Sequence, residues 1–234
     1  ERRVPMMGVL GAFVFSAQMI NFSIPGTGSS GHLGGATLLA ILLGPHAAFV
    51  VIASVVAVQA FFFADGGILA LGCNVFNIGF FPCLIAYPII YRSVVGARST
   101  PRRILAGSML SAVFGLQMGA FSVVAETALS GIAELPFHAF VAFMLPIHLA
   151  IGIVEGLITS AVVNVVWKAR PELLESSNSR FGQGFSAWKV FSGFAAATVL
   201  TAGVLSWFAS FHPDGLEWAV NRTSHDAGIS AQES

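Results

Sequence analysis

The stretch GGILALGCNVFNIGFFPCLIAYPIIY, residues 66–91, contains no charged residue. About 20 consecutive apolar residues are enough for a helix to cross a lipid bilayer. Uncharged, mostly apolar stretches recur at 104–125, 135–154 and 190–213, and another extends from residue 5 to residue 64. The sequence therefore predicts several membrane-spanning helices.

The overall composition agrees with a membrane protein. Of 234 residues, 56% are hydrophobic and only 9% are charged, and the mean hydropathy is +0.82. Soluble domains carry about a quarter charged residues. Eleven basic and eleven acidic residues cancel, which argues against a nucleic-acid-binding surface, and two cysteines exclude a disulfide framework. The predicted fold class is an all-α, polytopic membrane helix bundle.

Two loop signals divide the first long apolar stretch. IPGTGSSG, residues 24–31, has strong turn chemistry, and Gly44-Pro45 ends a helix because the residue before a proline disfavours helical geometry. The expected helices cover residues 6–22, 33–43, 46–63, 67–91, 103–125, 138–167 and 188–210. The polar stretch 168–187 is expected to be a linker, and the polar tail 219–234 is expected to be disordered.

The distribution of basic residues predicts the orientation of the helices. If the seven helices alternate across the membrane, ten of the eleven basic residues fall on one side. These are Arg2, Arg3, Arg92, Arg98, Arg102, Arg103, Lys168, Arg170, Arg180 and Lys189. Cytoplasmic loops carry an excess of basic residues, so this side is predicted to be cytoplasmic. The loop around His32 and the C-terminal tail are then outside.

His32 is the most informative polar residue. It follows the glycine-rich run GTGSSG and precedes Leu33-Gly34-Gly35, where a helix is expected to begin on the outer face. Glycines let a loop approach a ligand closely, and imidazole suits nickel, copper, zinc and cobalt. The alternative is that His32 only caps the helix or hydrogen-bonds the loop. The residues alone leave the two interpretations equally open.

Four further polar residues lie within predicted spans. His148 and Glu155 are seven residues apart, so they share one helix face about two turns apart. Ionisable residues inside a membrane mark function or a paired structural contact. We interpret Glu155 as a structural or gating partner rather than a ligand. Asn74 and Asn77, one turn apart, are typical of hydrogen bonds between membrane helices, with a role beside the metal as the alternative.

Other features concern subunits rather than ligands. The only lysines are Lys168 and Lys189, so the phosphate-binding motif G-x-x-x-x-G-K-[ST] does not occur. If the protein moves a solute uphill, other subunits must supply the energy. The small residues Gly8, Ala12 and Ser16 form a stripe that predicts helix packing, either within the chain or against another subunit.

Seven segments of the chain follow one another in a recognisable order. They are VPMMG (4–8), FVFSAQMINF (13–22), SGHLGG (30–35), LLGP (42–45), QAFFFADGG (59–67), GCNVFN (72–77) and HLAIGIVEGLIT (148–159). They resemble the CbiM/NikM family, the cobalt and nickel substrate-binding (S) components of energy-coupling-factor (ECF) transporters. HPDGLEW, residues 212–218, looks like the PDGLE module often fused to these proteins. The resemblance implies a metal-binding membrane domain at 1–175, a linker, helix and PDGLE-like module at 176–218, and the tail at 219–234.

The resemblance also implies a function. The protein would capture Co(II) or Ni(II), as a substrate and not a permanently bound cofactor, on the outer face of the plasma membrane, with cobalt feeding cobalamin synthesis. Its partners would be a transmembrane T component and two ABC ATPase subunits, which hydrolyse ATP, so the chain itself would not be an enzyme. The bundle would contain about six S-component helices and one C-terminal helix.

The family's metal site is a planar set of nitrogen ligands. They are the terminal amine, the backbone nitrogen and imidazole of the second residue, and a histidine in the S-G-H-L loop, which corresponds here to His32. Family members carry a Met-His start and a first helix before the equivalent of Glu1, so we expect that first helix to be missing here. With one imidazole, the chain alone is expected to bind Ni(II) or Co(II) weakly.

Two other functions are compatible with the residues. One is a structural or assembly subunit of the membrane that lacks its own metal site. The other is a multi-spanning membrane enzyme with His148 and Glu155 as a catalytic pair, although no recognised catalytic spacing accompanies them. Nickel and cobalt are not distinguished, because both accept nitrogen ligands.

Overall fold

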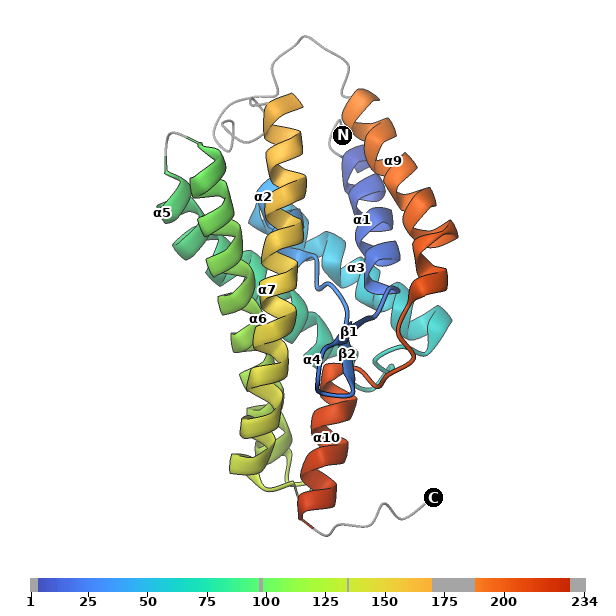
Figure 1. Cartoon of the computed structure of the whole chain (residues 1–234), viewed down its shortest axis with the longest axis vertical. Coiled ribbons are helices and arrows are strands. Elements are labelled where there is room, and N and C mark those ends of the chain that lie inside the picture. The colour runs from blue at the N-terminus through green and yellow to red at the C-terminus, as the bar shows by residue number, and fades with distance from the viewer. Residues whose placement is uncertain (1–3, 97–98, 134, 170–187, 228–234) are drawn as a thin grey trace.

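The computed structural model describes residues 4–96, 99–133, 135–169 and 188–227, and these form a bundle of helices with one small hairpin (Figure 1). The first half contains α1 (Val4–Gln18), β1 (Phe22–Ile24), β2 (Ser29–Gly31), α2 (Ala36–Leu43), α3 (Pro45–Phe63), α4 (Leu71–Val75), η1 (Phe76–Tyr91) and α5 (Arg92–Val95). The second half contains α6 (Pro101–Ser130), α7 (Phe137–Ala169), α9 (Trp188–Gly203), η2 (Leu205–Phe208) and α10 (Gly215–Asp226). The predicted all-α membrane bundle is confirmed.

Four helical segments of the described chain are long and apolar enough to cross a membrane. They are Pro45–Phe63, Leu71–Val95, Pro101–Ser130 and Phe137–Ala169, with hydropathy values between 1.6 and 2.1. Two apolar helices, Val4–Gln18 and Val190–Gly203, are shorter. The expected helices at 6–22, 33–43, 46–63, 103–125, 138–167 and 188–210 each correspond to a helix of the structure, with shifted ends.

The span at 71–95 is not a regular α-helix along its length. Its central part, η1, has π-helical hydrogen bonding and contains Pro82 and Pro88. Proline has no N–H to donate along the helix, which favours such departures from α geometry. The helix begins at Leu71 rather than at the expected residue 67, because Gly66 and Gly67 adopt positive φ angles of 72° and 73°. These two glycines form the turn after α3.

The first helix ends earlier than expected, and a hairpin follows it. α1 stops at Gln18 instead of residue 22, and Phe22–Ile24 pairs antiparallel with Ser29–Gly31. Gly26 and Gly28, with φ angles of 77° and 74°, form the connecting loop. The glycine-rich run is therefore an ordered hairpin that leads directly into His32.

The prediction of a disordered tail is wrong for residues 219–226. These residues belong to α10, whose N-cap is Asp214: its Oδ1 accepts a hydrogen bond of 2.8 Å from the backbone N–H of Glu217. Ala219 and Thr223 are fully buried. A capped end and a buried face stabilise a helix despite its polar composition. The predicted linker at 168–187 begins too early, because Lys168 and Ala169 are the last residues of α7. Its remainder, 170–187, and the tail at 228–234 lie outside the described residues.

α6 and α7 pack closely through glycines. An added Cβ at Gly156 would lie 2.7 Å from the Cα of Met109, and one at Gly152 would lie 3.0 Å from the Cα of Val113. Small residues let backbones approach in membranes, where helices gain little from hydrophobic burial against each other. These two helices, of 30 and 33 residues, run side by side in Figure 1.

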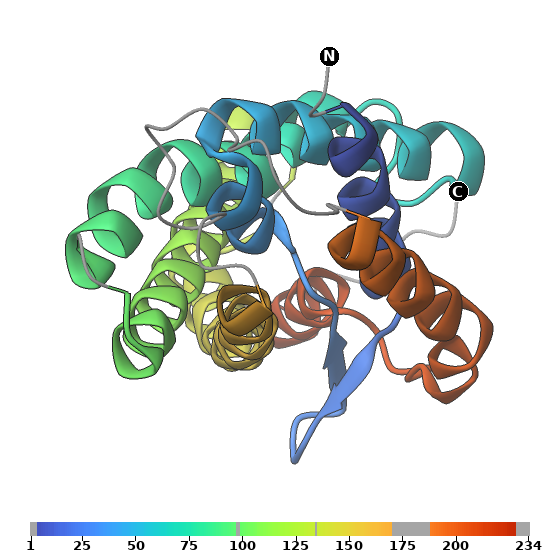
Figure 2. The ribbon, with the colours of Figure 1, turned by 90° about the horizontal axis from the view of Figure 1, so that it is seen from above.

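The basic helix ends of the described chain lie toward one end of the bundle. In Figure 1, α5, the first turn of α6 and the last turn of α7 lie toward the top, whereas the hairpin and α10 lie lower. Seen from above, the hairpin lies between the α7–α10 pair and the α1–α9 pair (Figure 2). Phe13 and Phe194 join α1 to α9, with ring centroids 5.3 Å apart.

Candidate metal site

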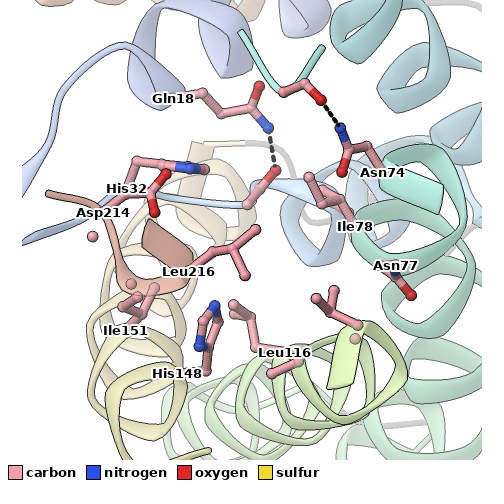
Figure 3. A pocket seen from close by; sticks show the side chains of 18 of the residues that line it. Gln18, His32, Asn74, Asn77, Ile78, Leu116, His148, Ile151, Asp214 and Leu216 are labelled. Atoms are coloured by element: carbon pink, nitrogen blue, oxygen red, sulfur yellow. Dashed lines mark hydrogen bonds between the residues drawn. The ribbon is translucent and has the colours of Figure 1, made fainter. Parts of the chain in front are cut away.

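A cavity of about 180 Å³ lies where the loop after β2 meets α7 and the start of α10. Segments distant in the sequence supply its polar lining, and Figure 3 shows several of these side chains. The polar and charged lining residues are Gln18, His32, Gln59, Asp65, Asn74, Asn77, His148, Glu155 and Asp214. Two imidazoles, His32 and His148, therefore line one space.

The position of His32 depends on the glycines around it. A Cβ at Gly31 would lie 2.5 Å from Cγ1 of Ile151, so this residue must be small for the hairpin to approach α7. Gly35 adopts a φ angle of 73° immediately before α2 begins. His32 is half-buried, and its Nδ1 lies 3.3 Å from the carbonyl oxygen of Leu33.

A chain of hydrogen bonds holds the loop after His32 in place. The backbone N–H of Gly34 donates to Oε2 of Glu155 at 2.7 Å, and Nε2 of Gln18 donates to the carbonyl oxygen of Gly34, also at 2.7 Å. Nε2 of Gln59 donates in turn to Oε1 of Gln18 at 2.8 Å. Glu155 is only 2% exposed. Polar groups buried in this way must find partners, so the chain ties α1, α3 and α7 to the loop.

Glu155 thus lies against the loop backbone, which is the geometry of a structural partner. Its carboxylate contacts Gly34, and an added Cβ at Gly34 would lie 3.0 Å from Oε2. Gln18 and Gln59 were not singled out from the sequence. Two glutamines in otherwise apolar helices were the available signal, because amide side chains inside a membrane require partners.

His148 presents one ring nitrogen to its own helix. Its Nδ1 lies 2.8 Å from the carbonyl oxygen of Met144, which assigns the proton to Nδ1 and leaves Nε2 with a lone pair. In Figure 3 the ring points into the cavity, near Leu116 and Leu216. Within the described chain, no hydrogen bond joins His148 to Glu155, so the geometry does not form the pair that the enzyme hypothesis needs.

The two asparagines contact different parts of the structure. Nδ2 of Asn77 donates to Oε2 of Glu126 on α6 at 2.8 Å, which links two helices. Nδ2 of Asn74 donates to the carbonyl oxygen of Gly66 at 3.0 Å, which closes the turn after α3. Both residues also line the cavity. Their side chains therefore make structural contacts at its edge.

The stripe of small residues on α1 is partly open. Gly8 and Ala12 are exposed, and a Cβ at Gly8 would meet no atom within 4 Å. Ser16 is buried, and its hydroxyl donates to the carbonyl oxygen of Ala12 at 2.9 Å. Packing within the described chain does not use Gly8, and a subunit interface at this stripe stays a prediction.

The cavity by itself does not assemble a complete set of metal ligands. Among the described residues, no three side chains of His, Cys, Asp or Glu converge in the manner of a metal site. His32 and His148 offer single nitrogen donors, as a nickel or cobalt ion prefers, but further ligands are needed to complete a coordination shell.

A bundle of apolar helices around a cavity lined by two imidazoles defines a polytopic membrane protein. Residues 1–173 match the family model CbiM, described as "Cobalt uptake substrate-specific transmembrane region", and residues 188–234 match the PDGLE domain. The chain belongs to the CbiM family. The resemblance to this family and to the PDGLE module is confirmed.

Named relatives and solved structures agree with this assignment. The chain is 34% identical over 187 residues to the fused nickel transport protein NikMN of Rhodobacter capsulatus, covering 74% of this chain and 53% of the relative. It is 29% identical over 178 residues to the cobalt transport protein CbiM of Geobacter sulfurreducens, covering 73% of this chain and 49% of the relative. The chain thus spans about half the length of these two relatives.

The fold is shared with a solved structure. A crystal structure of a transition metal transporter is 32% identical, covers 78% of this chain and 84% of its own, and superposes with a TM-score of 0.63. A truncated transition metal transporter gives a TM-score of 0.62 at 32% identity, covering 72% of this chain and 82% of its own. Both the sequence family and the three-dimensional fold therefore point to transition-metal transport proteins.

Proposed function

We propose that this protein is the substrate-capturing component of an ATP-driven uptake transporter for Ni(II) or Co(II). The observation that carries the proposal is the cavity that joins His32 to His148 beneath a loop held by buried hydrogen bonds. Membership of the CbiM family supports the same function, and so do the relatives named as nickel and cobalt transport proteins. The metal is substrate and leaves the protein again.

The chemistry of capture follows from the donors. A neutral imidazole nitrogen binds Ni(II) and Co(II) well, and His32 would be the ligand that this chain supplies. The contacts of Gly34 with Glu155 and Gln18 act outside the ligand shell. Such contacts orient a ligand before the metal arrives, which raises affinity because less freedom is lost on binding.

The remaining steps are assigned to partners. The sequence has no G-x-x-x-x-G-K-[ST] loop for ATP phosphates. Two ABC ATPase subunits would therefore hydrolyse ATP, and a transmembrane T component would transmit the resulting motion to this protein. The component itself is not an enzyme. The basic helix ends would face the cytoplasm of the cell, with the His32 loop and α10 toward the outside.

The proposal is tested by a competitive Ni(II) and Co(II) titration of the full-length protein, with an intact mass measured on the same sample. We expect one-to-one binding that weakens at least about tenfold in His32→Ala, since one nitrogen ligand is lost. His138→Ala is the matched control, because His138 is exposed on α7 and does not line the cavity. No metal binding by the wild type would instead support the assembly-subunit alternative, and equal binding by wild type and His32→Ala would show that His32 is not a ligand.

A further inference from the structure

The PDGLE segment is attached directly to the hairpin that carries His32. The backbone N–H of Ser30 donates to the carbonyl oxygen of Pro213 at 2.8 Å, and the hydroxyl of Ser30 donates to the carbonyl oxygen of His212 at 2.7 Å. The indole N–H of Trp218 donates to the carbonyl oxygen of Thr27 at 3.0 Å. These bonds connect residues more than 180 positions apart in the chain. The turn before α10 and the hairpin thus form one unit.

The same segment is seated on α7. A Cβ at Gly215 would lie 2.7 Å from Cγ2 of Ile147 and 3.2 Å from Cε1 of His148, so the backbone of Gly215 packs directly against the cavity wall. Gly215 is buried, and its two neighbours Asp214 and Leu216 line the cavity. Because Pro213 and Gly215 are both held, the position of Asp214 between them is defined.

Asp214 brings a carboxylate into the space shared by the two histidines. Its Oδ1 accepts the 2.8 Å hydrogen bond from Glu217 that caps α10, and for Oδ2 the described residues supply no hydrogen bond. Two other carboxylates line the cavity: Glu155 is buried and contacts Gly34, and Asp65 is exposed in the turn after α3. Asp214 is half-buried, and in Figure 3 it is drawn on the same side of the cavity as His32.

We infer that Asp214 is a binding residue of the metal cavity: its carboxylate attracts the incoming divalent cation and stabilises it beside His32. This inference rests on the proposed function. A fixed negative charge in a partly buried cleft focuses the local potential and accelerates capture of a cation, by an amount that falls as salt rises. The C-terminal module then contributes to substrate binding as well as to the fold.

The test compares two neutralising substitutions on the same helix. Asp214→Asn removes the charge but keeps a good N-cap, because asparagine caps helices as well as aspartate does. Glu217→Gln also removes one negative charge, but from an exposed residue outside the cavity. Association and dissociation rates of Ni(II) and Co(II) are measured on the full-length protein at low and high salt, together with the thermal unfolding midpoint.

We expect Asp214→Asn to reduce the association rate about tenfold at low salt, with a smaller reduction at high salt and an unchanged unfolding midpoint. Glu217→Gln should bind metal at the wild-type rate. Asp214→Ser, which also caps without a charge, should match Asp214→Asn, and Asp214→Glu should restore part of the rate. These comparisons separate the role of the charge from that of the cap.

Two results would overturn the inference in different ways. If the wild type binds metal and Asp214→Asn binds it at the same rates as Glu217→Gln, Asp214 has no part in capture, whereas the proposed function stands. If the wild type and every variant fail to bind either metal, the proposed function fails and this inference fails with it.

Discussion

Glu155 and Gly156 are neighbours on α7, yet they face two regions of the molecule that are held together differently. The carboxylate of Glu155 accepts the N–H of Gly34 and so holds the loop of His32. Gly156 faces α6, where its backbone approaches Met109 so closely that no Cβ fits. One helix therefore serves a polar, hydrogen-bonded region on one face and a close-packed apolar region on another.

The difference follows from what each region has to satisfy. Apolar helices in lipid gain little from burying against one another, so α6 and α7 depend on small residues that bring their backbones together. The loop around His32 has no helical hydrogen bonds of its own, and its backbone groups must find partners inside the protein. Glu155 and Gln18 supply those partners. Substitutions in the two regions should consequently have different effects.

The largest effect is expected for Glu155→Ala, which removes the partner of the Gly34 N–H. Loss of an outer-shell contact lowers metal affinity about 10- to 100-fold, and an unpaired buried donor costs about 1–3 kcal/mol of stability. Metal titration and thermal unfolding measure the two effects. Glu155→Gln is the control, because its amide oxygen still accepts the bond and should retain most of both properties. Wild-type affinity in Glu155→Ala would show that the loop is positioned without it.

A smaller effect, on stability alone, is expected for Gly156→Ala. The new Cβ would lie 2.7 Å from Cα of Met109 and 2.8 Å from its Sδ, so α6 must move away. Overpacking of this kind costs about 1–3 kcal/mol, while the metal affinity of the folded protein should not change. The matched control is Gly193→Ala on α9, where no atom lies within 4 Å and stability should be equal or higher. Reduced metal affinity in Gly156→Ala would remove the distinction between the two regions.

Trp218→Phe tests the attachment of the C-terminal segment to the hairpin. It removes the hydrogen bond to Thr27 but keeps an aromatic ring against Phe143, so the expected loss of stability is about 0.5–1.5 kcal/mol. Trp207→Phe, at a residue 86% exposed, is the control and should have no measurable effect. The unfolding midpoint in detergent distinguishes the two. Equal midpoints would mean that the indole bond contributes nothing to holding the segment.

The smallest effect on the isolated protein is expected for Gly8→Ala. No atom lies within 4 Å of the added Cβ, so stability should stay within about 0.5 kcal/mol of wild type. Gly11, about one turn further along α1, is buried. An added Cβ there lies 3.1 Å from Cγ1 of Val51, so Gly11→Ala should lower stability more than Gly8→Ala does. If the stripe on α1 docks another subunit, Gly8→Ala should also reduce co-purification of the T component, and unchanged co-purification would exclude that interface.

Local patterns account for the parts of the fold that were predicted correctly. Long apolar runs locate the spans at 46–63, 103–125 and 138–167 to within a few residues. A segment's ability to span a bilayer depends only on its own length and hydropathy. The C-terminal helix α10 was missed, although Asp214 followed three residues later by Glu217 is a helix-start pattern. Its residues are mostly polar, so no apolar run predicted a helix there; the helix is stabilised by packing on α7.

The sequence by itself determined a membrane bundle, the position of its long helices and its family, and it singled out His32 as a candidate ligand. Only the tertiary structure decided which polar residues surround that histidine. Glu155 meets Gly34 across 121 positions of the chain, and the PDGLE segment brings Asp214 to the cavity from near the C-terminus. Hydropathy and spacing act over one helix at a time, whereas these contacts depend on how distant helices pack, which no local pattern encodes.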